Sequence, residues 1–145
     1  MPKKVYIAMK FYFNIIFFFL TITNISFAVE TKIDWELLSK YDLKTKTVPK
    51  EVSTVMGKDV TLKGFIVPLD YQSLNLKEFL LMPYIPSCSH VPPPADNQIV
   101  LVTLEKSKTY KLSWYPVEVK GTLNLSKNKT LSGYSIIAKQ IKELK

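Results

Sequence analysis

The sequence has almost none of the residues from which disulfides and multi-residue metal clusters are built. Among its 145 residues there is one cysteine, Cys88, and one histidine, His90. One cysteine cannot form a disulfide within the chain or a cysteine-only metal cluster, and one histidine excludes any site that needs two. The length suits a single domain. We therefore expect one small fold stabilised by a hydrophobic core.

Arginine is absent, and all 20 basic residues are lysines. Arginine is the side chain that makes planar, bidentate contacts to phosphates and bases, and the lysines are spread along the chain rather than grouped. We therefore expect no specific binding of nucleic acid. The sequence also lacks a phosphate-binding loop, a nucleophile elbow and a dinucleotide fingerprint, so we do not expect an enzyme.

Residues 1–28 have the three-part pattern of a secretory signal peptide. Three lysines precede an apolar stretch that is densest from Ile15 to Leu20, and Ser26-Phe27-Ala28 places small residues at the two positions that a signal peptidase reads. The apolar run is shorter than the roughly 20 residues that span a bilayer, which disfavours an uncleaved membrane anchor. We predict export to the periplasm and a mature chain with 17 lysines, 12 acidic residues and no membrane span.

Two kinds of periodicity follow the signal. Residues 29–57 read as a helical lead-in, in which Asp34 caps one short helix, Pro49 opens a second and Gly57 follows its end. From Lys58 onward the pattern is that of strands. The predicted strands cover residues 59–69, 77–84, 98–105, 116–125 and 133–144.

Gly64 and Gly121 interrupt two of these strands, which suggests bends or bulges. Five short, bent strands predict a mainly β fold, a small OB-like barrel over residues 58–145, with a β-sandwich as the alternative. Trp114, just before the fourth strand, is interpreted as a plug of the core. The other predicted core residues are Phe65, Ile66, Leu80, Val100, Val102, Val119 and Ile136.

The segment with the most chemistry joins the second and third predicted strands. Cys88 and His90 are two residues apart, and three consecutive prolines, Pro92, Pro93 and Pro94, stiffen the loop after them. A thiol and an imidazole on one face of a stiff loop suit zinc or copper. Two ligands are too few for a structural zinc site, so the shell needs water, a second chain or a carboxylate from among Asp96, Asp70 and Glu78.

Two other interpretations of this loop remain open. In the first, Cys88 is a small buried apolar residue and His90 caps the loop through hydrogen bonds. In the second, the pair is a nucleophile and its base, although no helix N-terminus is present to acidify the thiol.

The sequence resembles a bacterial domain-of-unknown-function family of exported proteins and lipoproteins. The resemblance covers roughly residues 33–142 and rests mainly on Cys88-Ser-His90-Val91-Pro92-Pro93-Pro94 followed by Asn97-Gln98, with support from Gly57-Lys58-Asp59-Val60 and Val119-Lys120-Gly121. It implies no established activity. Because some members are encoded beside export or metal-linked ABC transporter components, it implies an accessory role in the envelope.

Taken together, these patterns predict a periplasmic accessory or binding module that is linked to an envelope protein or transporter component. Its metal site would consist of Cys88, His90 and Asp96, with zinc or copper as the ion. The alternative is a structural interaction domain that docks through the proline loop. In that case the partner-binding residues are Pro92, Pro93, Pro94, Asn97 and Gln98.

Overall fold

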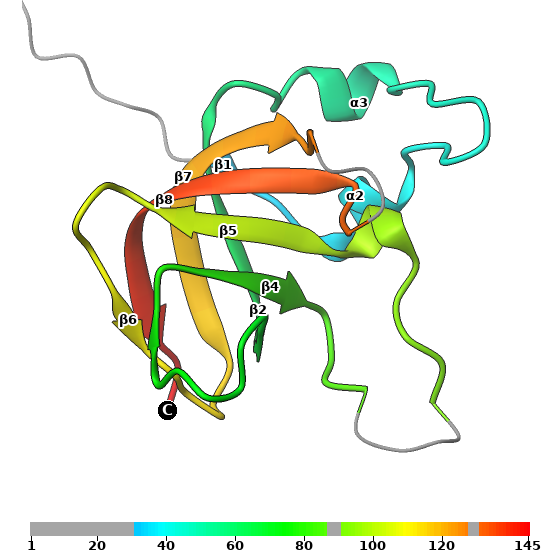
Figure 1. The fold of residues 1–145 in the computed structure, drawn as a ribbon. Helices are drawn as coiled ribbons and strands as arrows, with labels where there is room; N and C mark the ends of the chain where they lie inside the picture. Colours follow the sequence, from blue (N-terminus) through cyan, green and yellow to red (C-terminus); the bar gives the residue numbers. More distant parts are fainter. Residues whose placement is uncertain (1–30, 87–90, 128–130) are drawn as a thin grey trace, which may run out of the picture.

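A computed structural model describes residues 31–86, 91–127 and 131–145 (Figure 1). Its main sheet follows the order β1-β2-β4-β5-β8-β7, and a further pairing between β7 and β2 closes it into a barrel. Numbered along the chain, the five barrel strands run 1-2-3-5-4 and return to strand 1, which is the arrangement of an OB-like fold. The predicted fold class is confirmed. The barrel strands are β2 (Asp59–Pro68), β4 (Glu78–Met82), β5 (Val100–Leu104), β7 (Val117–Leu125) and β8 (Tyr134–Glu143).

The two glycines predicted to bend the sheet lie where the backbone of another strand comes very close. At Gly64, strand β2 ends its pairing with β7 and begins to pair with β4. The pairing of β7 with β8 shifts register between Lys120 and Gly121. A Cβ atom on Gly121 would lie 2.2 Å from the Ile137 carbonyl oxygen, and one on Gly64 would lie 2.6 Å from the Met82 carbonyl oxygen. Both positions therefore need a residue without a side chain.

The main core fills the barrel, and a smaller cluster lies apart from it. The core includes five of the predicted residues, Ile66, Val100, Val102, Val119 and Ile136. Leu80 belongs instead to the smaller cluster with Met82 and Ile99. Phe65 is only half-buried. These two predictions fail for one reason: successive residues of a strand point to opposite faces, so Ile66, Phe79 and Leu81 face the core while their neighbours do not.

The lead-in forms two short helices and an added edge strand. Strand β1 (Thr31–Lys32) runs parallel to β2. Helix α2 (Trp35–Ser39) is capped as predicted, because the Leu37 amide donates to the Asp34 carboxylate at 2.8 Å. Helix α3 (Lys50–Ser53) follows Pro49. Leu38 and Val52, one from each helix, are fully buried against the barrel core.

Two features depart from the expected pattern. Strands β3 (Asn75–Leu76) and β6 (Tyr110–Lys111) form a separate two-stranded sheet, and each is too short to carry a periodic signal. Trp114 is 69% exposed, so its interpretation as a core plug is wrong. No helix in the described part of the chain is both long enough and apolar enough to cross a membrane.

Candidate functional site

The predicted site lies on the connection between β4 and β5. Cys88 and His90 fall outside the described residues. After them, Val91, Pro92 and Pro93 are exposed while Pro94 is buried. The Tyr84 hydroxyl donates to the Pro92 carbonyl oxygen at 3.0 Å. The proline run is therefore a stiff, exposed segment that is anchored at two points.

The base of this loop is a 3-10 helix, η1 (Asp96–Gln98). The Asn97 side-chain amide donates to the carbonyl oxygens of Ser39 and Tyr41, both at 2.9 Å. The Gly133 amide donates to the Asp96 carbonyl oxygen at 2.6 Å. The loop is thereby fixed both to the lead-in and to the start of β8.

We call this region the proline end, meaning residues 91–98, the turn at residues 41–47 and residues 125–127 and 131–133. It is the end of the barrel at which α2, η1 and the start of β8 meet (Figure 1). Of the residues predicted to contact a partner, Pro92 and Pro93 are exposed on it and Pro94 is buried. The Asn97 side-chain amide is already hydrogen-bonded to the carbonyl groups of Ser39 and Tyr41. Gln98 is half-buried at the end of η1.

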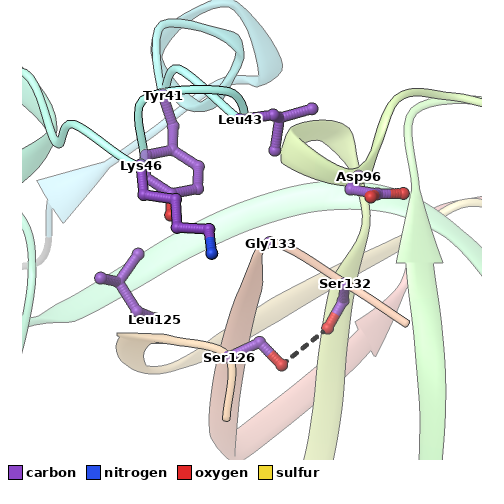
Figure 2. Close-up of a pocket in the computed structure, with 8 residues that line it drawn as sticks. All are labelled: Tyr41, Leu43, Lys46, Asp96, Leu125, Ser126, Ser132 and Gly133. Atoms are coloured by element: carbon purple, nitrogen blue, oxygen red, sulfur yellow. Dashed lines mark hydrogen bonds between the residues drawn. The ribbon is translucent and has the colours of Figure 1, made fainter. Parts of the chain in front are cut away.

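A pocket of about 100 Å³ opens beside the loop base. Figure 2 shows the Lys46 amine directed into it, above the hydroxyl groups of Ser126 and Ser132, with the Asp96 carboxylate directed away. Ser132 is fully buried and its hydroxyl donates to Ser126 at 3.0 Å. This volume accommodates a few water molecules or one small polar group. The positive amine and the hydroxyls favour an anionic group such as a carboxylate.

The turn that carries Lys46 holds it in an unusual backbone conformation. Lys46 has a φ of 56°. This is the left-handed region of backbone conformation, which residues other than glycine, asparagine and aspartate rarely adopt. Asp42 stabilises the turn by accepting hydrogen bonds from the amides of Lys44, at 2.8 Å, and Thr45, at 3.2 Å. Hydrogen bonds from the Thr45 side chain and from these two amides lower the pKa of the Asp42 carboxyl. Among the described residues, Lys46 has no acidic partner.

Tyr41, which lines the pocket, packs against Tyr134. Tyr134 is fully buried and its hydroxyl donates to the Leu38 carbonyl oxygen at 2.9 Å. Its ring centre lies 5.8 Å from that of Tyr41, with the rings tilted by 58°. Burial, followed by the proximity of Tyr41, raises the pKa of Tyr134 far above the physiological range. The Tyr134 hydroxyl therefore stays protonated at neutral pH, as its hydrogen bond to Leu38 requires.

The carboxylates proposed to complete a metal shell are widely separated in the fold. Glu78 begins β4, whereas the proline loop leaves from the opposite end of that strand, after Met82. Asp70 lies in the connection from β2 to β3, where it accepts a hydrogen bond from the Gln72 amide. Asp96 alone of the three belongs to the proline end. Within the described ranges, no three histidine, cysteine, aspartate or glutamate side chains are grouped closely enough to hold a metal ion.

Reasoning from the sequence missed the pocket. Its lining comes from three segments that are distant along the chain, and the turn around Lys46 reads only as a polar connector. Only the folded barrel brings Lys46 close to Ser126 and Ser132, and no local sequence pattern indicates this contact.

The fold and this end of it define a small OB-like barrel that carries a rigid proline loop. The chain belongs to the DUF3299 family, whose model, described as a protein of unknown function, matches residues 26–143. The family resemblance is confirmed at this level, whereas the cysteine-histidine-proline pattern remains a prediction.

The solved structures that are similar to the chain include the following two. A DUF3299 family protein from Pseudomonas aeruginosa PAO1 has 26% sequence identity and a TM-score of 0.59, over 81% of this chain and 97% of that one. A protein from Leishmania major Friedlin that is assigned as an aspartyl-tRNA synthetase has 11% identity and a TM-score of 0.43, over 84% of this chain and 22% of that one. No curated protein sequence matches the chain.

Proposed function

We propose that this DUF3299 protein is an exported accessory or binding module, not an enzyme, and that it holds a partner protein of the cell envelope at the proline end. The observation that carries the proposal is the bracing of an exposed proline run by Asn97. The hydrogen bonds from the Asn97 side-chain amide, 2.9 Å each, fix the loop base to two carbonyl groups of the lead-in. This bracing holds the exposed prolines in a fixed position relative to the barrel, ready to meet a partner.

A braced proline run is well suited to docking. Prolines lack backbone amides and favour an extended conformation, so little conformational entropy is lost when a partner binds them. Proline-rich segments dock into grooves lined by aromatic side chains. The described part of the run offers Val91, Pro92 and Pro93 to such a groove.

The pocket beside the run adds a second point of recognition. Because Lys46 is the charge directed into it (Figure 2), we propose that an acidic side chain of the partner enters there. The partner is then an envelope protein or transporter component that presents an aromatic groove next to an aspartate or glutamate.

Site-specific photo-crosslinking in cells that produce the full chain tests the docking proposal. A photoreactive residue at Pro92 should give one discrete adduct. The same residue at Thr103, exposed on the wall of the barrel, should give none. Lys46→Glu should weaken the Pro92 adduct, whereas Lys63→Glu, a charge reversal on strand β2, should leave it unchanged. Equal adducts from positions 92 and 103, or no adduct at either, would refute docking at this end.

Metal binding is the second candidate function, and the spacing of the only thiol and the only imidazole favours it. Residues two apart on extended backbone point to the same side, and Cys88 with His90 would supply a thiolate and an imidazole to zinc or copper. Asp96, exposed six residues further on, is the described carboxylate nearest along the chain.

Calorimetric titration of the reduced mature protein with zinc and with cuprous ion tests this candidate. Cys88→Ser and His90→Ala should each weaken binding, and binding should weaken as the pH falls because the thiolate becomes protonated. If the native protein binds no more tightly than the two variants, the metal site is excluded and docking alone remains.

A further inference from the structure

Figure 1 shows β6 and the chain's C-terminal end at the opposite end of the barrel from the proline loop. Residues of β6, of the segment before β7 and of the end of β8 line a second cleft there. Its volume is about 390 Å³, within the range of small-molecule sites. Trp114 and Tyr115, which line it, are 69% and 57% exposed. Both precede β7, and Glu143 at the end of β8 also lines the cleft.

Hydrogen bonds fix the backbone around this cleft. The Leu112 amide donates to the Leu74 carbonyl oxygen at 2.8 Å, beside the pairing of β6 with β3. The Ser113 hydroxyl donates to the Glu143 carboxylate and accepts from the Tyr115 amide at 3.1 Å. The two exposed rings therefore stand on a rigid base, and their exposure does not come from a loose terminus.

Charges of both signs occur at the cleft. The Lys145 amine lies 3.7 Å from the Glu143 carboxylate, and Lys111 also lines the cleft. The two lysines repel a cationic ligand that Glu143 would attract, and the Glu143 carboxylate repels an anionic ligand. The site offers both hydrogen-bond donors and acceptors together with two flat apolar faces.

We propose that this cleft binds a neutral saccharide. A pyranose ring has an apolar face of C–H groups, whose partial positive charge suits the negative face of an aromatic ring. Its hydroxyl groups donate and accept at the ring edge, so they match Glu143 as an acceptor and Lys111 as a donor. The sugar would stack on Trp114 or Tyr115 while its hydroxyls bond to these two side chains. This site is independent of the function proposed for the proline end.

Nuclear magnetic resonance provides a direct test, because the chain has two tryptophans, Trp35 and Trp114, and each has one indole N–H group. The Trp35 indole donates to the Lys63 carbonyl oxygen at 2.7 Å and serves as an internal control. Titration of the mature protein with chitotriose, and separately with cellotriose, should shift the Trp114 indole signal saturably and leave that of Trp35 unchanged.

Variants separate recognition from folding. Trp114→Ala should weaken binding at least tenfold, as followed by the remaining shifts around Leu112, while the retained Trp35 signal reports an intact fold. Tyr71→Ala removes an aromatic side chain that is 72% exposed but lies outside the cleft, and it should bind as the native protein does. The proposal is overturned if neither sugar gives a saturable shift. It is also overturned if Trp114 responds instead to oligothymidylate or to phosphatidylglycerol vesicles.

Discussion

The backbone amide of Gly133 donates to the Asp96 carbonyl oxygen at 2.6 Å, which joins the start of β8 to the base of the proline loop. A Cβ atom on Gly133 would lie 2.7 Å from that same oxygen and 3.1 Å from the Asn97 Cα. Both neighbours are backbone atoms, so they cannot rotate away as a flexible side chain would. This contact makes the geometry of the proline end dependent on one glycine.

Gly133→Ala should therefore destabilise the protein by about 1–3 kcal/mol, the usual cost of overpacking. Chemical denaturation of the native and variant proteins measures the change. Gly57→Asn is the matched control, because Gly57 has a φ of 72° but no atom within 4 Å of an added Cβ, and asparagine tolerates that conformation. An unchanged midpoint for Gly133→Ala would show that the contact at Asp96 is looser than described.

Asn97→Asp should destabilise the protein more than Asn97→Ala. The alanine variant leaves two carbonyl oxygens without their donor, at a cost of about 1–3 kcal/mol. The aspartate variant also places a negative charge against the carbonyl oxygens of Ser39 and Tyr41. Gln98→Ala is the control, since its side chain bonds to no described residue. Urea denaturation at neutral pH ranks the three variants, and equal stability of the aspartate and native proteins would contradict the bracing role.

The strand pattern was readable from the sequence because each barrel strand is long enough to alternate or to remain apolar throughout. The strands end within about two residues of their predicted limits. What failed was the choice between neighbours: Phe65 and Ile66 are both apolar, but the alternation that points Val60, Leu62 and Ile66 into the core points Phe65 to the opposite face. The prediction that Trp114 plugs the core was wrong for a related reason: no local pattern tells whether a tryptophan before a strand is buried or exposed. The pocket at Lys46 could not be predicted either, because it forms only when segments distant along the chain come together in the fold.

The ion pair between Asp59 and Lys139 should make stability depend on acidity. The Lys139 amine lies 2.6 Å from the Asp59 carboxylate, and its hydrogen bond, with a second from Thr122, lowers the pKa of Asp59. A carboxyl whose folded pKa is lowered contributes stability above its unfolded pKa of about 3.9. That contribution is lost as the pH falls through the lower folded value.

Lys139→Met should therefore reduce the loss of stability on acidification below about pH 4. The effect should be small, because both side chains are partly exposed. Free energies of unfolding measured across this range, with Lys142→Met as the control, test the assignment. A Lys139→Met curve parallel to that of the native protein would show that the pair contributes nothing measurable.

Export should remove residues 1–28, because a charged start, a short apolar run and Ser26-Phe27-Ala28 precede the mature chain. Intact-mass measurement of protein recovered from the periplasm should give a species that begins at Val29. Ala28→Leu should slow the cleavage, whereas Val29→Leu should not, because the residue after the cut is less restricted. A product that retains Met1 in the membrane fraction would show that the segment is an anchor.

Lys46→Asn should make the protein more stable while weakening the proposed docking. A side chain such as lysine is strained at a φ of 56°, and asparagine adopts this conformation more readily. The expected gain is about 1 kcal/mol, the lower end of the usual cost of this conformation. The turn itself should persist, because the two hydrogen bonds accepted by Asp42 do not involve Lys46. Lys44→Asn in the same turn removes an equal charge from a residue without a positive φ, and it should give neither effect. Thermal unfolding measures the stability, and the Pro92 photo-crosslink measures the docking. A gain in stability with an undiminished adduct would mean that Lys46 occupies its strained position without serving the proline end.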